Sequence, residues 1–127
     1  MGKGYLIDTN AIIEYLENKL PENASKLIDR LPSIQMSVIS RIELLAWSKA
    51  TANQLTMLEE FIQSSTVLTL SEEVIQETIK IRRQHRIKLP DVIIAATALA
   101  NDLILVSRNT SDFTIISGLT CVNPYNL

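Results

Sequence analysis

The sequence contains only one cysteine and one histidine, and aromatic residues make up 5% of its 127 residues. A lone Cys121 excludes an intramolecular disulfide, and a single histidine leaves no Cys/His cluster for zinc. We expect Cys121, which lies in a short apolar stretch, to be a small buried residue. The low aromatic content disfavours a surface that stacks single-stranded bases.

Long hydrophobic runs and strong net charge are also absent. No run approaches the roughly 20 apolar residues of a membrane-spanning helix, and residues 1–6 contain no apolar signal region. We therefore expect a cytoplasmic protein with no membrane segment. A net charge of −2 argues against a chain that coats nucleic acid unaided. The 46% apolar content excludes disorder, and the length predicts one domain over residues 1–127.

Short apolar runs alternate with segments of helical periodicity along the chain. Strands are expected at 5–7, 34–39, 66–70 and 103–106, with a fifth ending near 121–122. Helices are expected to begin at Thr9–Asn10, at Pro21, after Ser40, near Asn53, after Ser71 and at Pro90. This alternation predicts an α/β fold, a single α/β/α sandwich with a mostly parallel central sheet of four to five strands.

Acidic side chains follow the expected strands. Asp8 comes directly after the first strand, Glu43 lies after the second, and Asp112 follows the fourth. Asp91 opens the helix that starts at Pro90. Sites in open parallel sheets form outside the carboxyl ends of the strands, so these four acids can converge there. Such a cluster repels itself, and oxygen ligands favour Mg²⁺ or Mn²⁺ over zinc as the neutralising ion.

Each acid also has a structural explanation. Ser40 and Glu43 match a capping box, in which the Glu43 side chain returns a hydrogen bond to the backbone. Asp91 in a first helical turn complements the helix dipole. Asp8 and Asp112 fit ordinary turn or cap positions. The residues alone leave both interpretations open.

Four segments, in order, resemble the motifs of the PIN-domain family. The first is Leu-Ile-Asp-Thr-Asn at residues 6–10, and the second is Ser40-x-x-Glu43-Leu44. The third is Leu-Pro-Asp-Val-Ile-Ile-Ala-Ala-Thr-Ala at residues 89–98, and the fourth spans residues 105–113. The resemblance covers essentially the whole chain and is in particular to the VapC toxins of VapBC toxin–antitoxin pairs.

This resemblance implies a PIN domain over residues 1–127 that acts as a metal-dependent endoribonuclease. It implies that the catalytic and Mg²⁺- or Mn²⁺-binding residues are Asp8, Glu43, Asp91 and Asp112, supported by the polar residues Asn10, Ser107 and Asn109. It also implies an RNA substrate, a cognate VapB-like antitoxin and a homodimer. The chain departs from the family at Asn109, where many members carry Asp.

Basic residues stand close to two of these acids in the sequence. Arg86 and Lys88 belong to a basic segment that leads into Asp91, and Arg108 precedes Asn109. These three are candidate contacts for RNA phosphates. The alternatives are solvated residues that complement a helix dipole and, for Arg108, a structural salt bridge.

Three other functions compete with a nuclease. A catalytically silent PIN-fold binding or regulatory module is motivated by Asn109. A metal-dependent phosphatase of the haloacid-dehalogenase type needs a second Asp two residues after Asp8, where this chain has Asn10. A response-regulator receiver needs an adjacent acidic pair after the first strand, which residues 3–8 do not offer.

Overall fold

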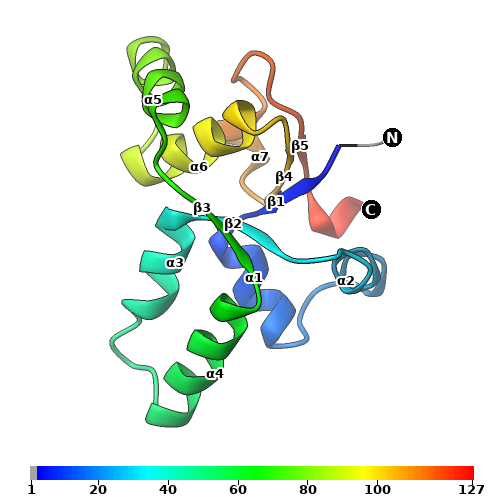
Figure 1. The fold of residues 1–127 in the computed structure, drawn as a ribbon. Coiled ribbons are helices and arrows are strands. Elements are labelled where there is room, and N and C mark those ends of the chain that lie inside the picture. The colour runs from blue at the N-terminus through cyan, green and yellow to red at the C-terminus, as the bar shows by residue number, and fades with distance from the viewer. Residues whose placement is uncertain (1–2) are drawn as a thin grey trace.

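The computed structural model describes residues 3–127, and its centre is a five-stranded sheet in which every pair of neighbours is parallel (Figure 1). The strands are β1 (Tyr5–Ile7), β2 (Gln35–Ser37), β3 (Thr66–Leu68), β4 (Ile104–Val106) and β5 (Cys121–Val122), in the spatial order β3-β2-β1-β4-β5. The predicted α/β fold is confirmed, with a fifth strand at the expected place. Met1 and Gly2, which belong to the predicted domain and N-terminal segment, lie outside the described residues.

Helices cover both faces of this sheet. On one side lie α1 (Thr9–Leu16), α2 (Glu22–Asp29), α3 (Val38–Leu45) and α4 (Ala52–Gln63). On the other side lie α5 (Glu72–Gln84), α6 (Leu89–Ala100) and the short α7 (Thr110–Phe113) (Figure 1). The result is the three-layer α/β/α arrangement that the alternation of strands and helices predicts.

The sheet separates two hydrophobic cores. On β1, Leu6 belongs to the core beneath α5 and α6, whereas Ile7 belongs to the core beneath α1, α2 and α4. Leu105 and Val106 repeat this alternation on β4. All four side chains are at most 1% exposed. Because both faces of the sheet are covered, the central strands β1 and β4 are continuous apolar runs, and polar residues follow directly where these two strands end.

Helix α6 is the most deeply buried of the helices in the described part of the chain. Pro90 stands in its first turn, where the missing backbone N–H costs nothing. Residues 94–98 are all buried, and the alanines among them allow close packing against α5 and the sheet. This packing fixes the direction of α6, so that Asp91 in its first turn has a defined position.

The boundary between β2 and α3 differs from the prediction. The expected strand over 34–39 ends at Ser37, and Val38 and Ile39 instead begin α3. The Ser37 hydroxyl caps α3 by accepting a 3.0 Å hydrogen bond from the Ile39 N–H. The prediction that Ser40 caps this helix is therefore wrong. β-branched residues favour strands on average, but here the Ser37 cap overrides that preference.

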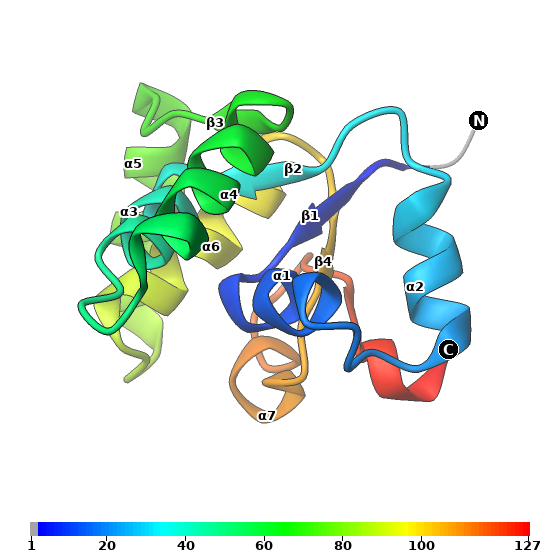
Figure 2. The same cartoon turned by 90° about the horizontal axis from the view of Figure 1, so that it is seen from below.

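The C-terminus packs back on the α1–α2 region. A short 3₁₀ helix, η1 (Pro124–Asn126), lies beside α2 (Figure 2). Asn23 of α2 donates a 3.1 Å hydrogen bond from Nδ2 to the Leu127 carbonyl, and the Tyr125 hydroxyl bonds to Glu14 of α1. Within residues 3–127, no helix has both the length and the apolar character that crossing a membrane demands.

Candidate functional site

Asp8 occupies the carboxyl end of β1 and is only 8% exposed. Its Oδ1 accepts a 2.8 Å hydrogen bond from the Thr9 N–H, which makes Asp8 the N-cap of α1. Its Oδ2 accepts a 2.7 Å hydrogen bond from the hydroxyl of Ser107, which follows β4. Asp8 therefore does fill a cap position, as the structural explanation expects, and its second oxygen is held by a neighbouring strand.

Glu43 reaches the same edge from α3. Its Oε1 accepts a 2.7 Å hydrogen bond from the Thr9 hydroxyl, and the Thr9 Oγ1 lies 2.8 Å from the Ser40 Oγ. The capping-box explanation for Ser40 and Glu43 is wrong, because both side chains turn across to α1. Glu43 therefore does not serve as a capping residue at the start of α3.

The segment after β4 brings Asn109 and Asp112 together. Asn109 is the N-cap residue of α7, and its backbone N–H donates a 3.0 Å hydrogen bond to the Ser107 Oγ. Its side-chain Nδ2 donates a 3.0 Å hydrogen bond to Oδ2 of Asp112. Ser107 thus links this segment to Asp8, since its one hydroxyl contacts both.

The charge of Asp8 is influenced by two other acids. Burial raises the pKa of the Asp8 carboxyl above its usual value, and the hydrogen bonds from Ser107 and Thr9 lower it. The carboxylates of Asp91 and Glu43 raise this pKa further. Like charges shift a pKa in this way only at short range, so three acids from three distant segments share one electrostatic environment.

Asp91 extends this group to the fourth acid. Burial raises the pKa of the Asp91 carboxyl, the Glu43 and Asp112 carboxylates raise it further, and the Lys88 ammonium lowers it. Asp91 and Asp112 both lie in first helical turns, where the helix dipole favours negative charge. The structure therefore brings together all four acids that follow strands or open helices in the sequence.

The donor atoms of this edge suit a hard divalent cation. Within residues 3–127, no group of three or more His, Cys, Asp or Glu side chains is arranged so that it could hold a metal ion. The hydrogen-bond donors to Asp8 are an uncharged hydroxyl and an amide, so its charge is not neutralised by an ion pair. All the converging acids offer oxygen, which Mg²⁺ and Mn²⁺ prefer. The chemistry of this donor set therefore fits such an ion, whereas the side-chain positions in this structure do not form a site around one.

The predicted polar and basic residues have different surroundings. Asn10 is exposed on α1, and Arg86 and Lys88 are exposed in the segment between α5 and α6. Lys88 lies close enough to lower the pKa of Asp91. Arg108, in contrast, lies 3.3 Å from Glu14 and stacks on the Tyr125 ring at 4.2 Å from its centroid.

The sequence analysis assigned no function to Thr9 and only a cap to Ser40. Both are buried; the Thr9 hydroxyl contacts the candidate acid Glu43, and the Ser40 hydroxyl contacts the Thr9 hydroxyl. Two signals in the sequence pointed to them. Thr9 directly follows Asp8, and Ser40 precedes Glu43 by three residues, which places both on one face of α3.

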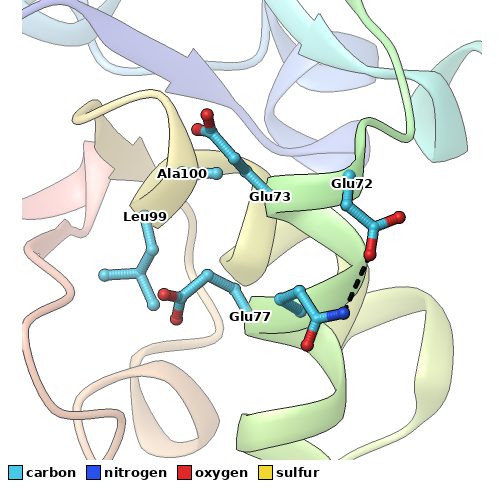
Figure 3. Close-up of a pocket in the computed structure, with 6 residues that line it drawn as sticks. Glu72, Glu73, Glu77, Leu99 and Ala100 are labelled. Atoms are coloured by element: carbon cyan, nitrogen blue, oxygen red, sulfur yellow. Dashed lines mark hydrogen bonds between the residues drawn. The ribbon is translucent and has the colours of Figure 1, made fainter.

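A second acidic region lies elsewhere, in a surface pocket of about 410 Å³ between α5 and α6. Figure 3 shows its lining residues, Glu72, Glu73 and Glu77 of α5 with Leu99 and Ala100 of α6. Leu99 is in the last turn of α6, about 12 Å along the helix from Asp91 in the first turn. This pocket is thus separate from the edge that carries Asp8.

Comparison with protein families gives one match that spans most of the chain. Residues 5–118 match the family model described as "PIN domain". No curated protein matches significantly in sequence.

Solved structures resemble this chain over almost its whole length. A toxin–antitoxin complex from Klebsiella pneumoniae contains a chain that is 27% identical, with a TM-score of 0.78 over 96% of this chain and 98% of that one. DNA-bound VapBC from Salmonella typhimurium gives 23% identity and a TM-score of 0.82, covering 97% and 99%. FitAcB from Neisseria gonorrhoeae gives 24% identity and 0.76, also covering 97% and 99%. The last two likenesses show the fold alone.

Proposed function

Because the chain belongs to the PIN-domain family, we propose that it is a metal-dependent endoribonuclease, the toxin of a type II toxin–antitoxin pair. The observation that carries this proposal is the convergence of the carboxyls of Asp8, Glu43, Asp91 and Asp112. The Asp91 and Glu43 carboxylates raise the pKa of Asp8, and the Glu43 and Asp112 carboxylates raise the pKa of Asp91. PIN domains are typically nucleases, and a carboxylate group at the end of a parallel sheet is where such chemistry is expected.

Asp8, Glu43, Asp91 and Asp112 would hold Mg²⁺ or Mn²⁺. When bound, such an ion activates water as a nucleophile and stabilises negative charge on a phosphodiester. The chain contributes the positions of the ligands: Ser107 and the Thr9 N–H fix the two oxygens of Asp8. Asn10, Ser107 and Asn109 are the supporting polar residues of this proposal.

Lys88 and Arg86 would bind the RNA. Both side chains are exposed, and Lys88 acts electrostatically on Asp91, so a phosphate bound there lies near the candidate centre. This local basic segment supplies the attraction for a polyanion that the net charge of −2 does not. Arg108 can join them only by leaving its contacts with Glu14 and Tyr125.

A cognate VapB-like antitoxin and a second copy of this chain are the proposed partners, and the cytoplasm the proposed location. The Klebsiella pneumoniae structure is a toxin–antitoxin complex, and the relation to it supports the first of these partners. Exposed apolar residues on α1 and α3 offer surface for contacts with protein partners, among them Ile13, Leu16 and Ile42.

The alternative is a PIN-fold module that binds but does not cleave. One contact favours it: the Asn109 Nδ2 donates a hydrogen bond to Oδ2 of Asp112 and so competes with a metal ion for that carboxylate oxygen. An acid at position 109 would instead add a ligand. Retained Mn²⁺ binding without cleavage distinguishes this module from the nuclease.

The test is cleavage of total cellular RNA by the purified protein in Mg²⁺ or Mn²⁺. Asp91→Asn removes one ligand charge, and Asp102→Asn is the matched control, because Asp102 is exposed at the turn before β4. We expect discrete cuts that vanish with EDTA and fall at least about 100-fold in Asp91→Asn, since metal assistance contributes several kcal/mol. Asp102→Asn should cut normally. Absence of both cleavage and Mn²⁺ binding in the wild type would refute the proposal.

A further inference from the structure

Thr9 connects the segments that carry two of the candidate acids. It is 8% exposed and begins α1, directly after Asp8. Its hydroxyl lies 2.7 Å from Oε1 of Glu43 and 2.8 Å from the Oγ of Ser40, both on α3. Its backbone N–H simultaneously binds Oδ1 of Asp8 at 2.8 Å. One residue therefore contacts both acids, through its main chain and its side chain.

The directions of these hydrogen bonds follow from the groups involved. A hydroxyl has one hydrogen to donate, and a carboxylate can only accept. The Thr9 hydrogen therefore goes to Glu43, and Ser40, which is fully buried, must donate its own hydrogen to the Thr9 Oγ1. The result is a directed chain from Ser40 through Thr9 to Glu43, in which each bond polarises the next.

We propose that Thr9 is a positioning residue that holds the Glu43 carboxylate toward Asp8. Glu43 is an exposed residue with a long side chain, so it samples several rotamers unless a partner restrains it. The Thr9 hydroxyl supplies that restraint from a buried position that α1 itself fixes. The inference deepens the proposed function and rests on it where Glu43 acts as a metal ligand.

The matched control for this proposal is Thr78. It is 9% exposed on α5, and its hydroxyl donates a 2.7 Å hydrogen bond only to the Val74 carbonyl of its own helix. Thr9→Val and Thr78→Val therefore remove the same hydroxyl from equally buried positions. Thr9→Ser keeps the hydroxyl, so it tests rescue by the conservative variant.

The first measurement is Mn²⁺ affinity by calorimetry without RNA, followed by kcat and KM for cleavage. We expect Thr9→Val to weaken Mn²⁺ binding and lower kcat by about 10–100-fold with little change in KM, as is usual when the partner of a metal ligand is lost. Thr9→Ser should restore most of both, and Thr78→Val should change neither. Wild-type Mn²⁺ affinity and kcat in Thr9→Val would overturn the proposal.

A second measurement separates this inference from the proposed function. If the wild-type protein neither binds Mn²⁺ nor cleaves RNA, the proposed function fails, and crystal structures of the metal-free variants decide on Thr9. A Glu43 carboxylate displaced in Thr9→Val but not in Thr78→Val supports positioning, whereas an unmoved carboxylate overturns it. Should Thr9→Val fail to fold by circular dichroism, Thr9→Ala replaces it under the same criteria.

Discussion

The Ser107 hydroxyl donates a 2.7 Å hydrogen bond to Oδ2 of Asp8, although the two residues are 99 positions apart in the chain. The contact exists because β1 and β4 are parallel neighbours, with Ile7 opposite Val106, so the residues that follow them emerge side by side. Ser107 is 1% exposed and also accepts the Asn109 N–H. A single hydroxyl thus links one candidate acid to the segment that carries another.

Replacement of Ser107 by alanine tests this link. Ser107→Ala leaves Asp8 Oδ2 and the Asn109 N–H without their partner in a buried place. We expect the free energy of unfolding at neutral pH to fall by about 1–3 kcal/mol, measured by urea denaturation. Ser111→Ala is the control, because Ser111 is exposed and its hydroxyl makes only a 3.4 Å contact with Asn109. Equal stability losses in the two variants would contradict this assignment.

Much of the carboxyl edge could be predicted because its signals are local. Asp8 stands where an apolar run ends, and a strand buried on both faces reads as such a run. Pro90 marks the first turn of α6, which places Asp91 at a helix N-terminus. The parallel sheet then follows from the alternation of strands and helices, and it brings these termini to one edge.

The contacts of the hydroxyls could not be predicted, because they depend on how distant segments pack. Thr9 meets Ser40 and Glu43 across 31 and 34 positions of sequence, and nothing in the local pattern specifies that approach. Ser40 fitted a capping box equally well, while the true cap, Ser37, stood inside a run with strand-like residues. Likewise, nothing in the sequence around Arg108 indicated that Glu14 and Tyr125 would be its partners.

The stability of the metal-free protein should depend on pH through Asp8 and Asp91. Both carboxyls have pKa values raised above 3.8 in the folded state, so the folded protein holds protons that the unfolded chain releases. The protonated carboxyls of Asp8 and Asp91 therefore stabilise the fold fully at pH values below 3.8, and this stabilisation is lost as the pH rises through their raised pKa values. Asp91→Asn, which stays neutral, should gain stability relative to the wild type from about pH 4 to neutrality.

Urea denaturation in EDTA across that pH range measures this gain. Asp102→Asn is the matched substitution, because the Asp102 side chain is 81% exposed and lies away from the candidate acids. A stability difference between Asp91→Asn and the wild type that does not change with pH would show that burial and the carboxylates of Glu43 and Asp112 do not raise the pKa of Asp91.

The basic residues beside the site should control RNA binding rather than cleavage. Arg86→Gln and Lys88→Gln each remove an exposed charge, so we expect a higher KM in both variants, with nearly unchanged kcat in Arg86→Gln, because Lys88 also acts on the pKa of Asp91. Each should also reduce the slope of log KM against log salt by about 0.7, the value for one phosphate contact on a single strand. Lys26→Gln on α2, where Lys26 pairs with Glu22 at 2.9 Å, should leave both quantities unchanged.

Arg108 should behave differently from Arg86. Its guanidinium pairs with Glu14 and covers the Tyr125 ring, so Arg108→Gln is expected to lower the melting temperature and leave the salt dependence of KM intact. Thermal melting and the KM series at several salt concentrations decide between these effects. A salt slope reduced as in Arg86→Gln would show instead that RNA phosphate takes Arg108 away from Glu14.

Cys121 should report the charge of Asp8 in the metal-free protein. It is half-buried on β5, and burial together with the Asp8 carboxylate raises the pKa of its thiol to about 11. Only the thiolate reacts, so alkylation by iodoacetamide should be slow at neutral pH and should increase with a midpoint at about 11. Asp8→Asn removes the nearby charge and should shift this midpoint downward, whereas Asp102→Asn should not. A midpoint unaffected by Asp8→Asn would mean that burial alone suppresses the thiolate.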